Sequence, residues 1–318
     1  MIRVSEPLLT GNEKKYLCEA IDEGEVSSGG KFVRQFEEAF AKWSGNKYAV
    51  GVSSGTGALE AAIWALGLRE ISIPSGTIIS CYVAAIRAGT KVLLRDNGTC
   101  PKHVHFMRCH LFGEFDDCLG LWNVDDLSQY WKPYTVPDVG CYSLYANKLV
   151  TSGEGGVIVT NREMIYERLK SYRNLCHGDE RFIHDDLGYN FRMSNVQAAV
   201  ALAQLEEINK FIEIKQKNRD LYLKHLPEEI APKFRCEVPW MYLVYYHGDA
   251  GKMVKKLLGL GVECRRFFYP LHRQSFIDVK GDFPKADDLW GHAFYLPSGL
   301  TLTEDEIIHV CKSLQSML

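Results

Sequence analysis

Short apolar segments recur through the first half of this 318-residue chain, and they constrain its fold more than any other feature. They are residues 48–52, 71–73, 92–94, 105–109, 121–124, 140–145 and 157–159. Their apolar residues follow one another without the alternation of a strand that has one wet face. Such runs are typical of strands buried on both faces, so they predict an α/β fold whose mostly parallel sheet is covered by helices.

Three residue pairs have the Ser/Thr-x-x-Glu/Gln spacing of a capping box, which marks the first turn of a helix. They are Thr10 with Glu13, Ser194 with Gln197, and Thr303 with Glu306. The pattern changes near residue 222, after which two expected strands flank one helix at 252–260. We therefore expect a large domain at 1–222 and a small C-terminal α+β domain at 223–318.

Composition argues against several classes of partner. Charged residues make up 24% of the chain and the formal net charge is −3, without a basic stripe for nucleic acid or a polybasic segment for a membrane surface. No apolar stretch approaches a membrane span, and the N-terminus lacks the apolar core of a signal peptide. The ten cysteines include no Cys-x-x-Cys pair, so we expect reduced thiols and a cytoplasmic location.

Cysteine and histidine residues gather in one segment, which raises the alternative of a zinc site. They are Cys100, His103, His105, Cys109 and His110. Their spacing matches no common zinc pattern. We therefore expect no metal.

Three local features could each carry chemistry. The small-residue loop 53–57 enters an expected helix, where unpaired N–H groups favour either a bound phosphate or a plain tight turn. Asp126 ends an apolar run and is either a helix cap or a partner for a protonated ring nitrogen. Lys148 lies between a strand and a Gly-rich turn, so it is either a surface lysine or a buried amine with a lowered pKa.

These three features occur in that order in one predicted domain, and the combination is more informative than any part. Pyridoxal 5′-phosphate needs an anchor for its phosphate, a partner for its pyridine nitrogen and an amine for its aldehyde. The sequence therefore favours an enzyme that depends on this cofactor.

Whole motifs resemble the DegT-like nucleotide-sugar aminotransferases, a family with the fold-type-I, aspartate-aminotransferase-like fold. The motifs lie at 26–33, 54–59, 109–113, 187–193, 197–199, 204–205 and 240–242. The most specific is Leu-Gly-Tyr-Asn-Phe-Arg-Met at 187–193, followed by Gln-Ala-Ala. Within the family, the chain is most similar to the GDP-perosamine synthase-like branch that aminates C4.

The resemblance implies a transaminase that alternates between pyridoxal and pyridoxamine phosphate. Lys148 would hold the aldehyde carbon of the cofactor and move protons, Asp126 would pair with the pyridine nitrogen, and Gln129 would lie beside the ring. L-glutamate would be the amino donor and a 4-keto-6-deoxy nucleotide sugar the acceptor. The C4 preference follows from Asn147 before the lysine and the Gly-Glu-Gly-Gly turn at 153–156.

The remaining cofactor contacts implied by the resemblance involve two subunits. Gly55 and Thr56 would bind the phosphate through backbone amides, and Ser143 would add its hydroxyl. Asn190 would reach the phosphate in the neighbouring subunit, which implies a homodimer with shared active sites. Candidates for sugar-nucleotide contacts, each of which could equally be a structural residue, are His184, Tyr189, Arg192 and His272.

The chain departs from the family pattern in two ways. It is shorter, and the segments 96–110 and 113–125 lack helices that would cover one face of the sheet, so a partner or a tighter dimer would have to cover it. The aromatic residue that usually stacks on the cofactor ring is replaced by Ile78, with Tyr82 as a substitute if that turn is helical.

These departures leave other functions open. The chain could be a non-catalytic homologue that acts as a binding or scaffold subunit. Alternatively, it could aminate C3 of a sugar or a keto-cyclitol.

Overall fold

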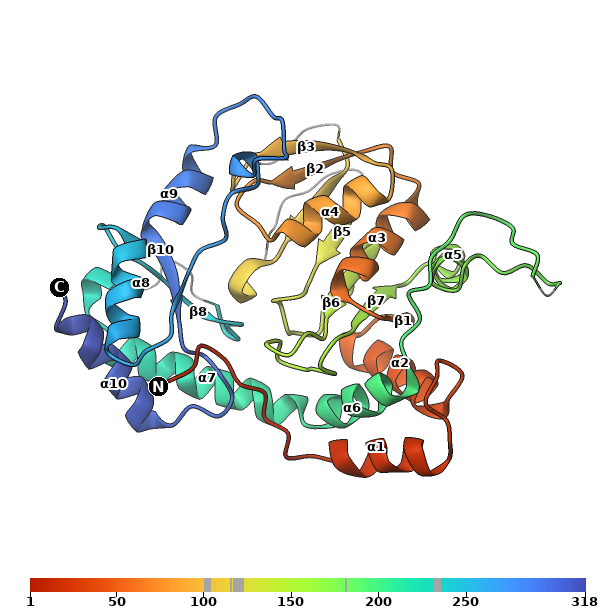
Figure 1. The fold of residues 1–318 in the computed structure, drawn as a ribbon, viewed down its shortest axis with the longest axis horizontal. Helices are drawn as coiled ribbons and strands as arrows, with labels where there is room; N and C mark the ends of the chain where they lie inside the picture. Colours follow the sequence, from red (N-terminus) through yellow and green to blue (C-terminus); the bar gives the residue numbers. More distant parts are fainter. Residues whose placement is uncertain (100–103, 115, 117–122, 181, 231–235) are drawn as a thin grey trace.

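Two sheets organise the chain in the computed structural model, which describes residues 1–99, 104–114, 116, 123–180, 182–230 and 236–318 (Figure 1). The larger sheet has seven strands in the order β1-β7-β6-β5-β4-β2-β3. They are β1 (Tyr48–Val52), β2 (Glu70–Pro74), β3 (Lys91–Arg95), β4 (Phe106–Cys109), β5 (Asn123–Asp126), β6 (Val139–Ser143) and β7 (Gly156–Thr160). Each coincides with a predicted apolar run, although residues 121 and 122 of one run lie outside the described part.

The direction of the strands confirms a mostly parallel sheet. Strands β2 to β6 pair in parallel, whereas β7 is antiparallel to both of its neighbours, β6 and β1. The carboxyl ends of β4, β5 and β6 therefore meet at one edge of the sheet, which is where ligands bind in open α/β folds.

Helices cover both faces of this sheet, as the apolar runs predicted. They are α1 (Glu13–Asp22), α2 (Lys31–Ser44), α3 (Gly55–Leu66), α4 (Ile79–Arg87), α5 (Glu163–Arg173) and α6 (Asn195–Glu206). Strand β6 shows the arrangement directly, because its successive side chains enter different cores. Cys141 packs in the cluster under α3 and α4, and Tyr142 packs with Phe36 and Phe40 of α2.

Two of the three predicted capping boxes are present. Ser194 with Gln197 caps α6, and Thr303 with Glu306 caps the last helix. The box predicted at Thr10 is wrong: α1 begins only at Glu13, whose carboxylate accepts a hydrogen bond from the buried side chain of Gln204. A hydrogen bond between residues far apart in the sequence is present in place of the predicted capping box.

The C-terminal part is built on the three-stranded sheet, in the order β8-β10-β9. Its elements are α7 (Ile208–His225), η2 (Glu228–Ile230), β8 (Tyr242–Tyr245), α8 (Ala250–Gly259), β9 (Arg265–Arg266), η3 (Leu271–Arg273), α9 (Pro284–His292), β10 (Ala293–Leu296) and α10 (Glu304–Gln315). The boundary predicted at 222/223 falls inside α7 and stays a prediction. Ile2 pairs with Val262, so the first residues of the chain also contact this part.

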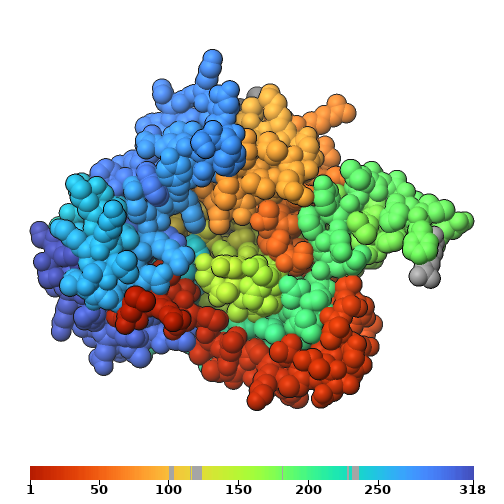
Figure 2. Space-filling view, viewed as in Figure 1, coloured from red at the N-terminus to blue at the C-terminus, as the bar shows by residue number. Residues whose placement is uncertain are grey.

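One segment projects from the body of the molecule between α5 and α6 (Figures 1 and 2, green). Its side chains include exposed Phe182, Ile183 and Leu187. We call residues 174–190 the arm. Exposed apolar side chains on a projecting segment are typical of a surface that another chain covers.

The segments predicted to lack helices include residues 100–103, 115 and 117–122, which lie outside the described part. The short helix η1 (Leu111–Gly113) follows β4, and β3 forms the half-buried edge of the sheet. None of the described helices combines the length and the apolar character that a bilayer crossing requires.

Candidate active site

Lys148 lies in the connection between β6 and the antiparallel strand β7, which spans residues 144–155. The connection is closed by a hydrogen bond from the Leu144 N–H to the Gly155 carbonyl (2.9 Å). Only 8% of Lys148 is exposed, and its Nζ lies 4.3 Å from the ring centroid of Trp240. Burial lowers the pKa of Lys148 to about 8, against a smaller opposing effect of the Asp126 carboxylate. A substantial neutral fraction is therefore available as a nucleophile near neutral pH.

Asp126 ends β5 at the same edge of the sheet and is buried. One carboxylate oxygen, Oδ1, accepts a hydrogen bond from the Ser128 N–H (3.0 Å), and Oδ2 accepts one from Cys81 Sγ (3.3 Å). Gln129 is held by a hydrogen bond from the Phe112 N–H to its Oε1 (2.8 Å). A fixed, buried carboxylate is suited to hold a protonated ring nitrogen.

The loop before α3 forms an anion cradle. Ser54 caps the helix by accepting a hydrogen bond from the Gly57 N–H (3.0 Å), so the preceding N–H groups of Gly55 and Thr56 stay without a partner inside the helix. A Cβ atom on Gly55 would lie 2.7 Å from the Cβ of Ser143. Glycine is required there because the helix start packs against the end of β6.

One cavity of about 390 Å³ brings these groups together. Figure 2 shows the surface hollowed beside the yellow-green segment that carries Lys148, between the orange helices and the blue C-terminal part. Six residues that the sequence assigned to catalysis or to cofactor binding line it: Gly55, Thr56, Asp126, Gln129, Ser143 and Lys148. The structure therefore brings these six residues together, while the role of each stays a proposal.

Four further lining residues come from the C-terminal part and were not assigned a role from the sequence. They are Trp240, Arg265, Phe268 and Tyr295. Trp240 lies in a motif that supported the resemblance, which is the one signal that could have identified it. Arg265 and Tyr295 lie on the short strands β9 and β10, where no local motif marks them.

The other predicted site residues lie outside this cavity. Asn190 is exposed at the base of the arm, and His184 is on the arm, where its Nδ1 contacts the Leu175 carbonyl (2.7 Å). Arg192 lines a separate cavity of about 270 Å³ and donates to Asn174 Oδ1 (2.8 Å).

Tyr189 and His272 likewise have structural contacts. The Tyr189 ring stacks on Phe191 at a centroid distance of 5.3 Å. His272 contacts Ser75 Oγ through Nδ1 (2.7 Å) and Asp287 through Nε2 (3.1 Å). Within one protomer, these two residues do not contact the Lys148 cavity, and their substrate roles stay predictions.

The sequence indicated Ile78 at the position where the family usually has an aromatic residue that stacks on the cofactor ring. Ile78 lines the cavity at the start of α4. Tyr82 is on the helical turn that would let it substitute, but its ring packs near Phe276, with centroids 6.5 Å apart. Within the described part of the chain, the aromatic ring in contact with the lysine amine is that of Trp240.

Two described members of the cysteine and histidine cluster, Cys109 and His110, have different partners. Cys100 and His103 lie outside the described residues. His110 contacts the Asp125 carboxylate (3.2 Å), on the other side of the strand from Asp126. Cys109 lies beside Cys81.

The groups around the cavity fit pyridoxal phosphate. A buried amine of lowered pKa can bind its aldehyde, a buried carboxylate can pair with its nitrogen, and the start of α3 can hold its phosphate. The α/β fold and this site define a class: the fold-type-I enzymes that use this cofactor.

The comparison with known proteins then gives the family. Residues 7–99 and 134–315 match the model of the DegT/DnrJ/EryC1/StrS aminotransferase family, and the chain belongs to this family. Aminotransferases of this family depend on pyridoxal phosphate, which agrees with the cofactor predicted from the sequence.

Individual relatives match along almost the whole chain. The GDP-perosamine synthase of Escherichia coli O157:H7 is 31% identical, with 98% of this chain and 97% of the relative covered. That of Vibrio cholerae is 29% identical, with 99% of each covered. A solved structure of the putative sugar aminotransferase Spr1654 from Streptococcus pneumoniae, in its PLP form, has a TM-score of 0.88 at 16% identity, covering 100% of this chain and 99% of its own. This last likeness shows that the fold is shared.

The lowered pKa of Lys148 predicts how cofactor capture depends on pH. The neutral amine is the reactive form, so the rate at which cofactor-free protein binds pyridoxal phosphate should rise with pH and level off above about pH 8. Stopped-flow absorption of the lysine-bound cofactor measures this rate, with Lys148→Ala as the blank. A rate that keeps rising up to the ordinary lysine pKa of 10.5 would contradict the effect of burial.

The close packing of Gly55 predicts the effect of one methyl group. In Gly55→Ala the new Cβ meets Ser143, and overpacking of this kind should weaken pyridoxal phosphate binding roughly 10- to 100-fold. Gly259→Ala is the matched control, because its Cβ meets nothing within 4 Å. Fluorescence titration with the cofactor compares the two variants, after circular dichroism has shown that both are folded. Equal affinities in the two would refute the cradle.

Proposed function

We propose that this chain is a pyridoxal-phosphate-dependent sugar aminotransferase that converts a 4-keto-6-deoxy nucleotide sugar to the 4-amino sugar, with L-glutamate as the amino donor. The observation that carries the proposal is the buried amine of Lys148 in one cavity with the Asp126 carboxylate and the anion cradle at Gly55. Full-length similarity to proteins named GDP-perosamine synthase supports this choice of acceptor.

Different residues of the cavity carry out different parts of the transamination. When bound, the cofactor supplies an electron sink for the electrons left on the substrate carbon. Lys148 takes the proton from that carbon as a neutral amine and returns a proton as an ammonium group, so a pKa near 8 suits both steps. Asp126 keeps the ring nitrogen protonated, and Gly55, Thr56 and Ser143 anchor the phosphate.

Amination at C4 is supported by the residues around the lysine. Asn147 and Glu154 both line the cavity, and they belong to the two segments whose residue types resemble the C4-aminating branch. The Asn147 carbonyl accepts a hydrogen bond from the Trp240 indole (2.9 Å), so this segment is fixed against the C-terminal part. Amination of C3 or of a keto-cyclitol is the alternative among enzymes.

We further propose a homodimer with shared active sites. Asn190 lies at the base of the arm, outside the cavity of its own protomer, and the arm carries exposed Phe182, Ile183 and Leu187. A second copy of the chain would cover these side chains and receive Asn190 near its phosphate cradle. The expected location is the cytoplasm.

A non-catalytic scaffold is the rival from another class. It was suggested by the short length and by Ile78. The intact set of Lys148, Asp126 and Ser143 in one cavity favours the enzyme, because a scaffold has no need for a desolvated lysine.

The two half-reactions test the proposal separately. Wild type loaded with pyridoxal phosphate should lose its absorption band on addition of L-glutamate and form 2-oxoglutarate, whereas Lys148→Ala should do neither. Added GDP-4-keto-6-deoxymannose should then restore the band and yield the amino sugar, seen by mass spectrometry. Activity on only a 3-keto nucleotide sugar or a keto-cyclitol would replace the proposed acceptor, and a protein that binds cofactor without any turnover would favour the scaffold.

Subunit mixing tests the shared site. Lys148→Ala and Asn190→Ala should each be impaired as homodimers, because each damages both sites. After exchange of subunits, a hybrid dimer has one site with both changes and one with neither, so the mixture should exceed the sum of its parts in activity. If native mass spectrometry shows hybrids and the activity is only additive, Asn190 serves its own subunit.

A further inference from the structure

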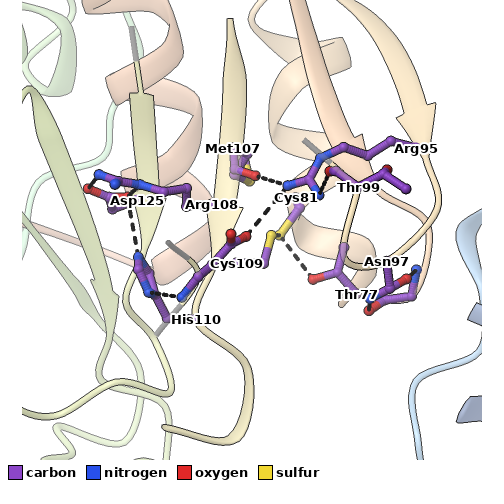
Figure 3. Close-up of polar contacts among 12 residues, drawn as sticks. Thr77, Cys81, Arg95, Asn97, Thr99, Met107, Arg108, Cys109, His110 and Asp125 are labelled. Atoms are coloured by element: carbon purple, nitrogen blue, oxygen red, sulfur yellow. Dashed lines mark hydrogen bonds and ion pairs between the residues drawn. The ribbon is translucent and has the colours of Figure 1, made fainter. Parts of the chain in front are cut away.

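Two cysteine side chains lie beside the carboxylate of Asp126, which lines the cavity. Cys81 is on the first turn of α4 and Cys109 ends β4, and neither thiol is appreciably exposed. The two sulfurs are 3.9 Å apart, and the hydroxyl of buried Thr77 lies 3.8 Å from the sulfur of Cys81 (Figure 3). Cys81 Sγ is 3.3 Å from Oδ2 of Asp126.

The Cys81 thiol has one proton and three polar neighbours, so its direction can be assigned. Asp126 offers the shortest contact and the charged acceptor, and hydrogen bonds to ionised acceptors are the stronger ones. Thr77 and Cys109 can then donate to the Cys81 sulfur, which accepts weakly. Thr77 and Cys109 thus donate to Cys81, which donates to one carboxylate oxygen of Asp126. Each hydrogen bond in this series polarises the next.

Asp125 and Asp126 are neighbours in the sequence, but their side chains contact different polar groups. Arg108 and His110 contact Asp125, whose side chain points to the opposite face of β5, as Figure 3 shows for these three labelled residues. Among the described residues, the Asp126 carboxylate accepts hydrogen bonds from the Cys81 thiol on Oδ2 and from the Ser128 N–H on Oδ1. Each oxygen therefore keeps a lone pair for a ligand in the cavity that Asp126 lines.

We propose that Cys81 is a positioning residue for the cofactor: its S–H group donates to Oδ2 of Asp126 and keeps the carboxylate directed at the cavity. The consequence for the cofactor rests on the proposed pairing of Asp126 with the pyridine nitrogen. A thiol suits this task because it is a weak donor. It restrains the carboxylate in an apolar setting, while leaving Oδ2 able to accept a second hydrogen bond from the ring.

Infrared spectroscopy tests the hydrogen bond itself in the cofactor-free protein. The S–H stretching band of Cys81 should lie below that of an unperturbed buried thiol, and it should disappear in Cys81→Ser. It should move to higher frequency in Asp126→Asn, because an amide oxygen is a weaker acceptor than a carboxylate. Cys264→Ala, a buried thiol in the C-terminal part, should leave this band in place. A Cys81 band that does not respond to Asp126→Asn would overturn the assignment.

Cofactor affinity tests the consequence. Removal of the donor in Cys81→Ala should raise the dissociation constant of pyridoxal phosphate roughly 3- to 10-fold. Cys81→Ser keeps a donor and should recover much of the loss, whereas a purely structural role of the sulfur would make serine at least as harmful as alanine. Cys264→Ala should bind like wild type. Unchanged affinity in Cys81→Ala would overturn the positioning role.

These measurements are independent of the reaction. Neither uses an amino donor or a sugar, so a wrong choice of acceptor would leave both results standing. The cofactor affinity of Asp126→Asn separates the two premises. If it too is unchanged, Asp126 does not pair with the ring, whereas a loss in Asp126→Asn without one in Cys81→Ala overturns the positioning role alone.

Discussion

The desolvation of a single amino group is the constraint on which the rest of the site depends. Lys148 loses water because the Trp240 ring covers its Nζ at 4.3 Å, and this cost outweighs the attraction of Asp126 and brings its pKa to about 8. Trp240 is itself fixed, since its indole donates to the Asn147 carbonyl and its own carbonyl accepts from buried Lys215 of α7 (2.7 Å). The reactivity of the lysine therefore depends on the C-terminal part of the chain, which supplies Trp240, as well as on the connection between β6 and β7.

Much of the fold could be predicted because it depends on local patterns of apolar residues. Every expected run in the first half coincides with a strand, since strands buried on both faces need consecutive apolar side chains. The edge where β5 and β6 end brings Asp126 and Ser143 together by parallel pairing, and the start of α3 joins them because β1 and β6 are both antiparallel to β7 and so run in the same direction. The cofactor was reached from the order of three short features, and the family from a resemblance in whole motifs.

What the sequence did not predict depends on contacts between distant segments. Glu13 bonds to Gln204 instead of closing a capping box, and nothing near Thr10 signals that choice. Of the strands behind the C-terminal wall of the cavity, only β10, which carries Tyr295, was not expected from the sequence, because its four residues give too little periodicity to recognise. Ile78 lines the cavity, but the packing of Tyr82 near Phe276 depends on a loop far along the chain.

The reversed direction of β7 has an entropic consequence for the lysine. An antiparallel neighbour lets residues 144–155 return beside β6 without a crossover, and two hydrogen bonds tie this connection together, from the Leu144 N–H to the Gly155 carbonyl and from the Ser152 N–H to the Leu144 carbonyl. The backbone on both sides of Lys148 is therefore pinned to the sheet, and the chain gives up its conformational freedom there when it folds. Little freedom remains to be lost when a ligand engages the amine, so more of the intrinsic strength of that contact is retained as affinity.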